Sequence, residues 1–163
     1  MSKPTAFDMN IILPVASRGL LNDAEIIKQA IQKNDPTIFI RIISKEKGYL
    51  PLILKSFSVV LRKLLGTKQV TFHLEEIQPF FINFSSQNFF IPNQEWLRGR
   101  TRSKMNEQNM AVLCKTQYAL EQLSSLCKNI RYLGFTSINR NNNTLPDFNQ
   151  FIHIAGKSPP KRY

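Results

Sequence analysis

Residues suited to proton transfer gather at the end of one apolar run. His73, Glu75 and Glu76 close the segment that begins at Gln69. An imidazole or a carboxylate at this place could take a proton from an attacking hydroxyl group. If strand alternation continues through them, His73 and Glu75 point to one side and Glu76 to the other. Equally, the two glutamates could begin a helix, because negative charge is favourable at a helix N-terminus.

A second acidic group stands beside the single tryptophan, in residues 92–96. Glu95 precedes Trp96, and Asn93 lies two residues earlier. A ring next to a carboxylate suits sugar binding, since the ring stacks on the apolar face of a sugar while the acid bonds its hydroxyl groups. The alternative is a helix start with Asn93 as the cap and Trp96 packed on the core. Composition alone favours this alternative.

Three further segments follow apolar runs and carry groups that could meet a phosphate or a ligand. Gly156, Lys157 and Ser158, with Lys161, could hold a diphosphate through backbone N–H groups and ammonium charge. Lys115 and Thr116 follow another run, where Thr116 is equally a good helix N-cap. Gly19 could let the backbone approach a ligand, although a glycine after a strand more often makes a simple turn. No segment matches GxGxxG or a P-loop, so neither a dinucleotide nor ATP is indicated.

The apolar runs that carry these groups alternate with helical patterns. We expect strands over residues 9–16, 37–43, 69–74, 88–92, 110–114, 130–135 and 151–155. We expect a loop over 17–22 and helices over 23–32, 49–65 and 117–127, with Asn22 or Asp23 as the first cap and Gly66 as a C-cap. This alternation predicts an α/β fold, with a Rossmann-like, mostly parallel, doubly wound sheet flanked by helices. Ligands bind such sheets at the carboxyl ends of the strands, where the candidate residues recur.

Composition narrows the classes of protein to which the chain can belong. Its 163 residues include two cysteines, Cys114 and Cys127, which argue against a disulfide scaffold and a metal site. No apolar stretch approaches the ~20 residues of a membrane span, and the N-terminus lacks the apolar segment of a signal peptide, so we expect a cytoplasmic protein. The net charge of +11 permits binding to nucleic acid, acidic lipid or a phosphorylated ligand. Part of the charge is concentrated in residues 98–104; a generic basic surface is favoured, and a nucleic-acid-binding module is the alternative function.

Taken in order, the motifs resemble the N-terminal half of a GT-B-type glycosyltransferase. The series comprises residues 73–75, 91–96, 112–116, 132–137 and 151–158, and residues 10–30 resemble the first βα unit of that half. The resemblance spans about residues 9 to 161. It implies two Rossmann-like domains facing a cleft, the first receiving the acceptor and the second binding a nucleotide-sugar. Transfer in this family is typically metal-independent, with phosphate charge stabilised by Lys, Arg and helix N-termini.

The resemblance assigns roles to the candidate residues. The acceptor side of the cleft would include Gly19, His73, Asn93, Lys115 and Thr116, with Glu75, Glu76 and Glu95 as candidates for the catalytic base. The turn near the donor diphosphate would comprise Gly156, Lys157, Ser158 and Lys161. No cofactor is implied, because the nucleotide-sugar is a substrate.

The resemblance also implies a domain organisation. Residues 1–8 form a tail, 9–137 the acceptor-side domain, 138–149 a linker, and 150–163 the first strand and turn of a truncated second domain. Relatives usually continue after the Lys161 position with a glycine and a small hydroxyl residue, whereas this chain ends in Arg162 and Tyr163. We therefore expect an experimental boundary, a truncated or frameshifted gene, or half of a split enzyme, inactive or weakly active alone. The implied partners are a sugar or other hydroxyl acceptor and a separate C-terminal half.

Overall fold

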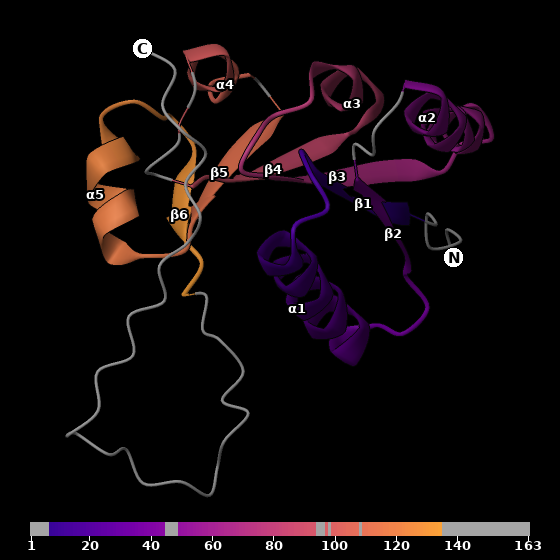
Figure 1. Ribbon diagram of the computed structural model, residues 1–163, viewed down its shortest axis with the longest axis horizontal. Helices are drawn as coiled ribbons and strands as arrows, with labels where there is room; N and C mark the ends of the chain where they lie inside the picture. The colour runs from indigo at the N-terminus through magenta and orange to yellow at the C-terminus, as the bar shows by residue number, and fades with distance from the viewer. Residues whose placement is uncertain (1–6, 45–48, 94–96, 98, 108, 135–163) are drawn as a thin grey trace, which may run out of the picture.

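A six-stranded, wholly parallel sheet forms the centre of the protein. The computed structural model describes residues 7–44, 49–93, 97, 99–107 and 109–134, with the backbone alone for residues 49–56 and Arg100. The strands are β1 (Phe7–Leu13), β2 (Phe39–Ser44), β3 (Lys68–Leu74), β4 (Gln87–Ile91), β5 (Met110–Cys114) and β6 (Ile130–Tyr132). They lie in the order β2-β1-β3-β4-β5-β6 (Figure 1). The predicted α/β fold, with its Rossmann-like parallel sheet, is confirmed.

Five helices flank this sheet on its two faces. They are α1 (Arg18–Asn34), α2 (Tyr49–Leu64), α3 (Pro79–Phe84), α4 (Gly99–Lys104) and α5 (Gln117–Ser124). Among the described helices, α1 alone packs on one face, and α2, α3 and α4 lie on the other (Figure 1). The core under α1 is built on Ile11 and Leu13 of β1. A separate core joins Ile82 of α3 and Leu123 of α5 to Phe90 of β4.

Helix α1 begins earlier than the sequence predicts. The expectation of a loop over 17–22 is wrong, because Ser17 caps the helix by accepting a 3.3 Å hydrogen bond from the Leu20 N–H. Leu20 then makes the first buried contact of the helix, four residues before Ala24. The serine cap and this early leucine together start the helix five residues before the predicted start at Asp23.

The end of helix α2 agrees with the sequence. Gly66 has φ +85°, its N–H donates to the Lys63 carbonyl, and the Thr67 N–H donates to the Arg62 carbonyl, both at 3.0 Å. This pair of bonds is a Schellman motif, which needs the left-handed conformation that glycine adopts without strain. The predicted C-cap is confirmed, and the chain passes from α2 into β3 within a few residues.

The predicted domain boundaries are only partly covered by the described residues. Strand β1 begins at Phe7, two residues inside the expected tail. The linker over 138–149 and the second-domain segment over 150–163 lie outside the described part of the chain. None of the described helices is long and apolar enough to cross a membrane.

Candidate functional site

The strand order reverses between β1 and β3. From β1 the chain crosses to β2 on one side, and from β3 it proceeds through β4 and β5 on the other. Ligands bind parallel sheets beside such a reversal, at the carboxyl ends of the strands. Because every strand is parallel, the segments that follow β1, β3, β4 and β5 meet at this edge. They carry Gly19, Glu75, Asn93 and Lys115.

Glu75 has the most unusual backbone at this edge. Its φ is +60°, and it is the one non-glycine residue with a positive φ among those the structure describes. Its N–H donates to the Ile91 carbonyl at 2.9 Å, and the next N–H, of Glu76, donates to the Leu74 carbonyl at 2.7 Å. The second bond closes a γ-turn around Glu75. Such a conformation costs about 1–3 kcal/mol for a residue with a side chain, and it concentrates at functional sites.

This turn rules out both sequence-based descriptions of the two glutamates. Strand β3 ends at Leu74, so side-chain alternation does not continue to Glu75 and Glu76. Helix α3 begins only at Pro79, so the glutamates do not lie in its first turn. They lie in a connection of their own between the strand and the helix. The tight turn at Glu75, and not strand geometry, therefore determines where its carboxylate is presented.

Asn93 holds the carboxylate of Glu75. Its side-chain Nδ2 donates a 3.2 Å hydrogen bond to Glu75 Oε1. Asn93 follows β4 and Pro92, so the bond joins the ends of two neighbouring strands. Both residues are partly buried. The family resemblance implies that both face an acceptor, which stays a prediction, and the structure brings the two side chains into direct contact.

His73 supports the same turn from within the protein. Its ring is fully buried, with Nε2 3.0 Å from Asn88 Oδ1 and with Nδ1 accepting the Gln78 N–H at 3.3 Å. Because Nδ1 accepts, the ring proton is assigned to Nε2, which donates to Asn88. Burial lowers the pKa of His73 to about 4, against a smaller upward effect of the Asn88 bond. The neutral imidazole thus holds the backbone of Gln78 and is itself fully buried.

Lys115 connects the edge to helix α1. Its Nζ forms an ion pair with Oδ2 of Asp23, about one turn beyond Gly19 in the helix. Gly19 is exposed in the first turn of α1, and a Cβ atom added to it would meet nothing within 4 Å. The backbone of this turn is therefore open to approach. The charge of Lys115 is balanced by a carboxylate.

Thr116 acts as a helix cap. Its Oγ1 accepts a 3.1 Å hydrogen bond from the Ala119 N–H at the start of α5, so the predicted N-cap is confirmed. The remaining candidates, Glu95, Gly156, Lys157, Ser158 and Lys161, lie outside the described residues.

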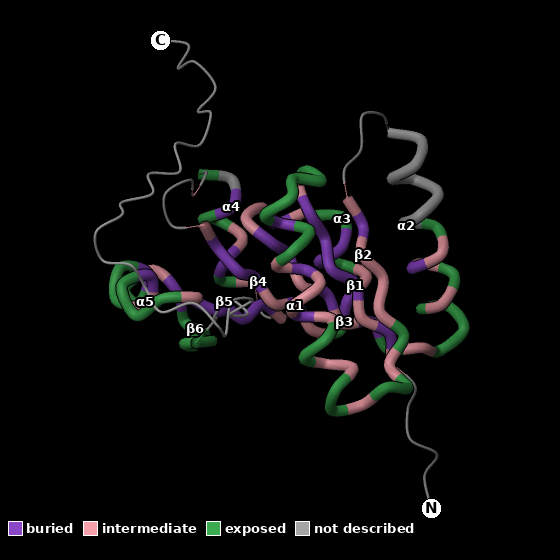
Figure 2. Tube along the Cα trace, turned by 60° about the horizontal axis from the view of Figure 1, so that its bottom comes forward, coloured by how far each residue is buried: buried purple, intermediate pink, exposed green. Residues whose placement is uncertain are grey.

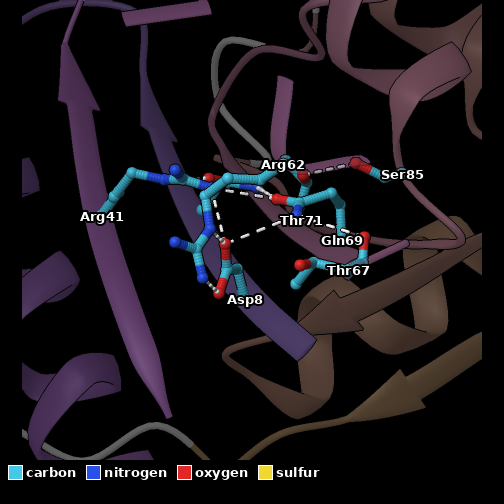
Figure 3. Close-up of polar contacts among 8 residues, drawn as sticks. Asp8, Arg41, Arg62, Thr67, Gln69, Thr71 and Ser85 are labelled. Atoms are coloured by element: carbon cyan, nitrogen blue, oxygen red, sulfur yellow. Dashed lines mark hydrogen bonds and ion pairs between the residues drawn. The ribbon is translucent and has the colours of Figure 1, made fainter. Parts of the chain in front are cut away.

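A buried polar layer between the sheet and α2 was missed by sequence reasoning. Asp8 of β1 accepts hydrogen bonds from Nη2 of Arg41 at 3.2 Å and from Nη2 of Arg62 at 2.9 Å, with a further contact from Arg62 Nε (Figure 3). Two guanidinium groups thus share one carboxylate. Gln69 accepts from Arg41 at 3.0 Å and donates to Asp8 at 3.4 Å. Asn10 joins the same network by accepting from Arg41 Nε at 2.9 Å.

The position of this polar layer suits a structural role. Its members come from the amino-terminal and middle parts of the strands, away from the carboxyl edge. Within the described residues, every buried side-chain polar atom has a hydrogen-bond partner. Arg62 belongs to α2, so the network fastens that helix to β1 and β2. The signal in the sequence was the two-residue spacing of Asp8 and Asn10, which puts both side chains on one face of β1.

The two cysteines give no sign of reactivity. Cys114 and Cys127 are buried and unbonded to each other, and burial raises the pKa of Cys114 to about 11. A thiol of this kind is protonated at neutral pH and is a poor nucleophile. No group of three or more His, Cys, Asp or Glu side chains in the described ranges is arranged to hold a metal ion.

Comparison with known proteins leaves the geometry as the main guide to function. No protein-family model, curated protein or solved structure matches the chain.

Proposed function

We propose that the chain is the acceptor-side domain of a GT-B-type glycosyltransferase that acts in the cytoplasm. In this proposal Glu75 takes the proton from the acceptor hydroxyl. The observation that carries the proposal is the strained turn at Glu75, which presents a carboxylate at the carboxyl edge beside the reversal of strand order. A non-glycine residue at φ +60° is unfavourable, and function is a reason for such a residue to persist.

The contact with Asn93 suits the carboxylate to this task. Glu75 Oε1 accepts the Asn93 amide, and a carboxylate offers further lone pairs on Oε2. An acceptor hydroxyl bonded to Oε2 would transfer its proton to Glu75 while its oxygen bonds the anomeric carbon of the donor sugar. The bond from that carbon to the nucleoside diphosphate breaks with its electron pair. General-base help of this kind typically contributes 10²–10⁴-fold to a rate.

The first turn of α1 provides the other side of the acceptor position. Gly19 leaves its backbone uncovered, and the Lys115–Asp23 pair lies about one turn further along α1. A helix N-terminus carries partial positive charge, which favours a hydroxyl oxygen that is losing its proton. Sugar hydroxyl groups could also bond the Lys115–Asp23 pair, which offers a donor and an acceptor together.

The nucleotide-sugar would be bound by a second α/β domain. In this proposal Gly156, Lys157, Ser158 and Lys161 form the turn near the donor diphosphate, as the family resemblance implies. The direct test is to read the nucleotides downstream of the Tyr163 codon in the gene. A second α/β domain encoded there that binds a nucleotide-sugar would support the proposal. The absence of any such domain would contradict the proposal.

An activity assay tests the half-enzyme form of the proposal. The 163-residue chain is incubated with a panel of nucleotide-sugars, and release of nucleoside diphosphate is measured with and without sugar acceptors. We expect no turnover above the uncatalysed rate. Hydrolysis or transfer by this polypeptide alone would contradict the division of the site between two halves.

The alternative function is binding to nucleic acid, and α4 is the segment that favours it. Helix α4 contains the basic cluster, with Arg102 exposed and Lys104 bonded to Glu107 at 2.9 Å. A gel-shift titration across salt concentrations separates the two functions. Specific binding should show a steep salt slope and persist near physiological salt. A basic surface that only solubilises the domain would give weak, unselective retardation.

A further inference from the structure

The outer face of helix α2 carries an exposed apolar stripe. Phe57, Leu61, Leu64 and the following Leu65 are each between 46% and 79% exposed. On the inner side of the same helix, Val59 is fully buried against Ile12 and Ile43 of the sheet. At 100° per residue, Phe57, Leu61 and Leu64 lie within about 60° of one another and roughly opposite Val59. The helix is therefore apolar on both faces, and Figure 2 shows its described outer segments exposed.

Basic side chains border this stripe. Lys63 and Lys68 are exposed, and Arg62 is 43% exposed. Lys63 donates to the Asn83 carbonyl at 2.9 Å and lies over the Phe84 ring, so its ammonium group is held on the side of α2 that faces α3. Asp8 is the carboxylate nearest to α2 in the hydrogen-bond network, and it is shared between Arg41 and Arg62. The surroundings of the stripe thus keep a net positive charge.

The sequence segment that contains α2 is also basic. Residues 36–74 contain seven Lys or Arg and a single acid, Glu46, so this segment supplies more than half of the net charge of +11. The exposed Lys63 and Lys68 would repel the same two side chains of a second copy docked on this stripe. They would attract a surface that carries negative charge above an apolar layer.

We propose that the α2 stripe docks the protein on an anionic membrane surface. Phe57, Leu61, Leu64 and Leu65 enter the boundary between headgroups and acyl chains, while the exposed Lys63 and Lys68 at the side of the helix meet lipid phosphates. Amphipathic helices that lie in the interface combine these features: Phe and Leu on one face and Lys or Arg beside it. Clustered cations strengthen attachment to anionic lipid in particular. The proposal is independent of the glycosyltransferase assignment, because it concerns a different face of the protein.

Vesicle sedimentation of the full 163-residue chain tests the proposal. Vesicles of phosphatidylcholine alone are compared with vesicles that also contain phosphatidylglycerol. We expect binding to the anionic vesicles that weakens as salt rises, and at least about tenfold weaker binding to the neutral ones. The variant L61Q/L64Q should reduce binding to anionic vesicles by about tenfold or more, because it removes two leucine side chains that the membrane would bury. The variant K63Q/K68Q should reduce the preference for anionic vesicles.

A matched variant controls for general loss of apolar surface. Leu21 of α1 and Tyr118 of α5 are also exposed, and L21Q/Y118Q should bind anionic vesicles as the unchanged chain does. Circular dichroism and thermal unfolding verify that each variant is folded, which is expected because the replaced side chains are exposed. Failure of the unchanged chain to bind anionic vesicles would overturn the proposal, as would equal binding by L61Q/L64Q. A dimer in analytical ultracentrifugation that L61Q/L64Q dissociates would also overturn it, because a second copy would then cover the stripe.

Discussion

The side-chain amide of Asn93 donates a 3.2 Å hydrogen bond to the carboxylate of Glu75, across the ends of two adjacent parallel strands. Glu75 reaches this position through a γ-turn with φ +60°, and the buried ring of His73 accepts the Gln78 N–H from below the same connection. The Asn93 bond and the γ-turn thus fix one acidic side chain at the edge where parallel sheets bind ligands, and His73 holds the connection that follows it.

Replacing Glu75 with glycine should relieve backbone strain. Glycine adopts φ +60° freely, whereas a residue with a side chain pays roughly 1 kcal/mol or more there. Glu76 has no positive φ, so Glu76→Gly should bring only the usual flexibility of glycine in the unfolded chain. We expect the free energy of unfolding of Glu75→Gly to exceed that of Glu76→Gly by about 1 kcal/mol in urea titrations. Equal loss of stability in the two variants would show that Glu75 is not strained.

The two arginines on Asp8 should differ in their effect on stability. The side chain of Arg41 is 15% exposed and bonds Asp8, Asn10 and Gln69, whereas that of Arg62 is 43% exposed. Arg41→Met removes donors from buried acceptors and should cost about 3–5 kcal/mol. Arg62→Met leaves Asp8 bonded to Arg41 and should cost about 1–2 kcal/mol. Urea unfolding followed by circular dichroism compares the two, and a larger loss for Arg62→Met would reverse this assignment.

His73 should make stability depend on pH. Its pKa is lowered to about 4 in the folded protein by burial, compared with 6.5 in the unfolded chain. As pH falls from 6.5 to 4, the unfolded chain gains a proton that the folded protein does not, so the free energy of unfolding decreases. The loss approaches about 3 kcal/mol near pH 4 and vanishes from about one pH unit above 6.5.

A glutamine variant isolates this effect from the titration of carboxylates. Glutamine at position 73 can still donate and accept hydrogen bonds, but it does not titrate. The difference in free energy of unfolding between the unchanged chain and His73→Gln should therefore fall between pH 6.5 and 4. A difference that stays constant over this range would mean that His73 does not remain neutral in the fold.

The sheet could be predicted from the sequence, but its short helices could not. Apolar runs rich in β-branched and aromatic residues mark the strands, and β5 matches its predicted bounds over 110–114. Gly66 marks the end of α2 through the left-handed turn that it permits. Helices α3 and α4 have six residues each, too few to show a periodic apolar stripe.

The sequence predicts which residues lie at the site, but it does not predict how their side chains are arranged. A parallel sheet brings the ends of its strands together, so Glu75 and Asn93 could be placed at one edge from the sequence. The positive φ of Glu75 gives no local signal, because glutamate has no preference for that conformation. The buried Asp8 network could not be predicted, because polar residues at every second position of a strand usually face solvent. Here α2 covers them.

Acceptor binding at Glu75 is the most direct test of the central claim. The isolated chain and its variant Glu75→Gln are titrated with a panel of sugar acceptors and followed by NMR, with Glu121→Gln on the exposed outer side of α5 as control. We expect at least one acceptor to shift the signals of Gly19, Glu75 and Asn93, and Glu75→Gln to weaken that binding about tenfold through loss of a charge-assisted hydrogen bond. Glu121→Gln should leave the affinity unchanged. Equal affinity of the unchanged chain and Glu75→Gln for the acceptor would contradict the account. So would the absence of acceptor binding at this edge.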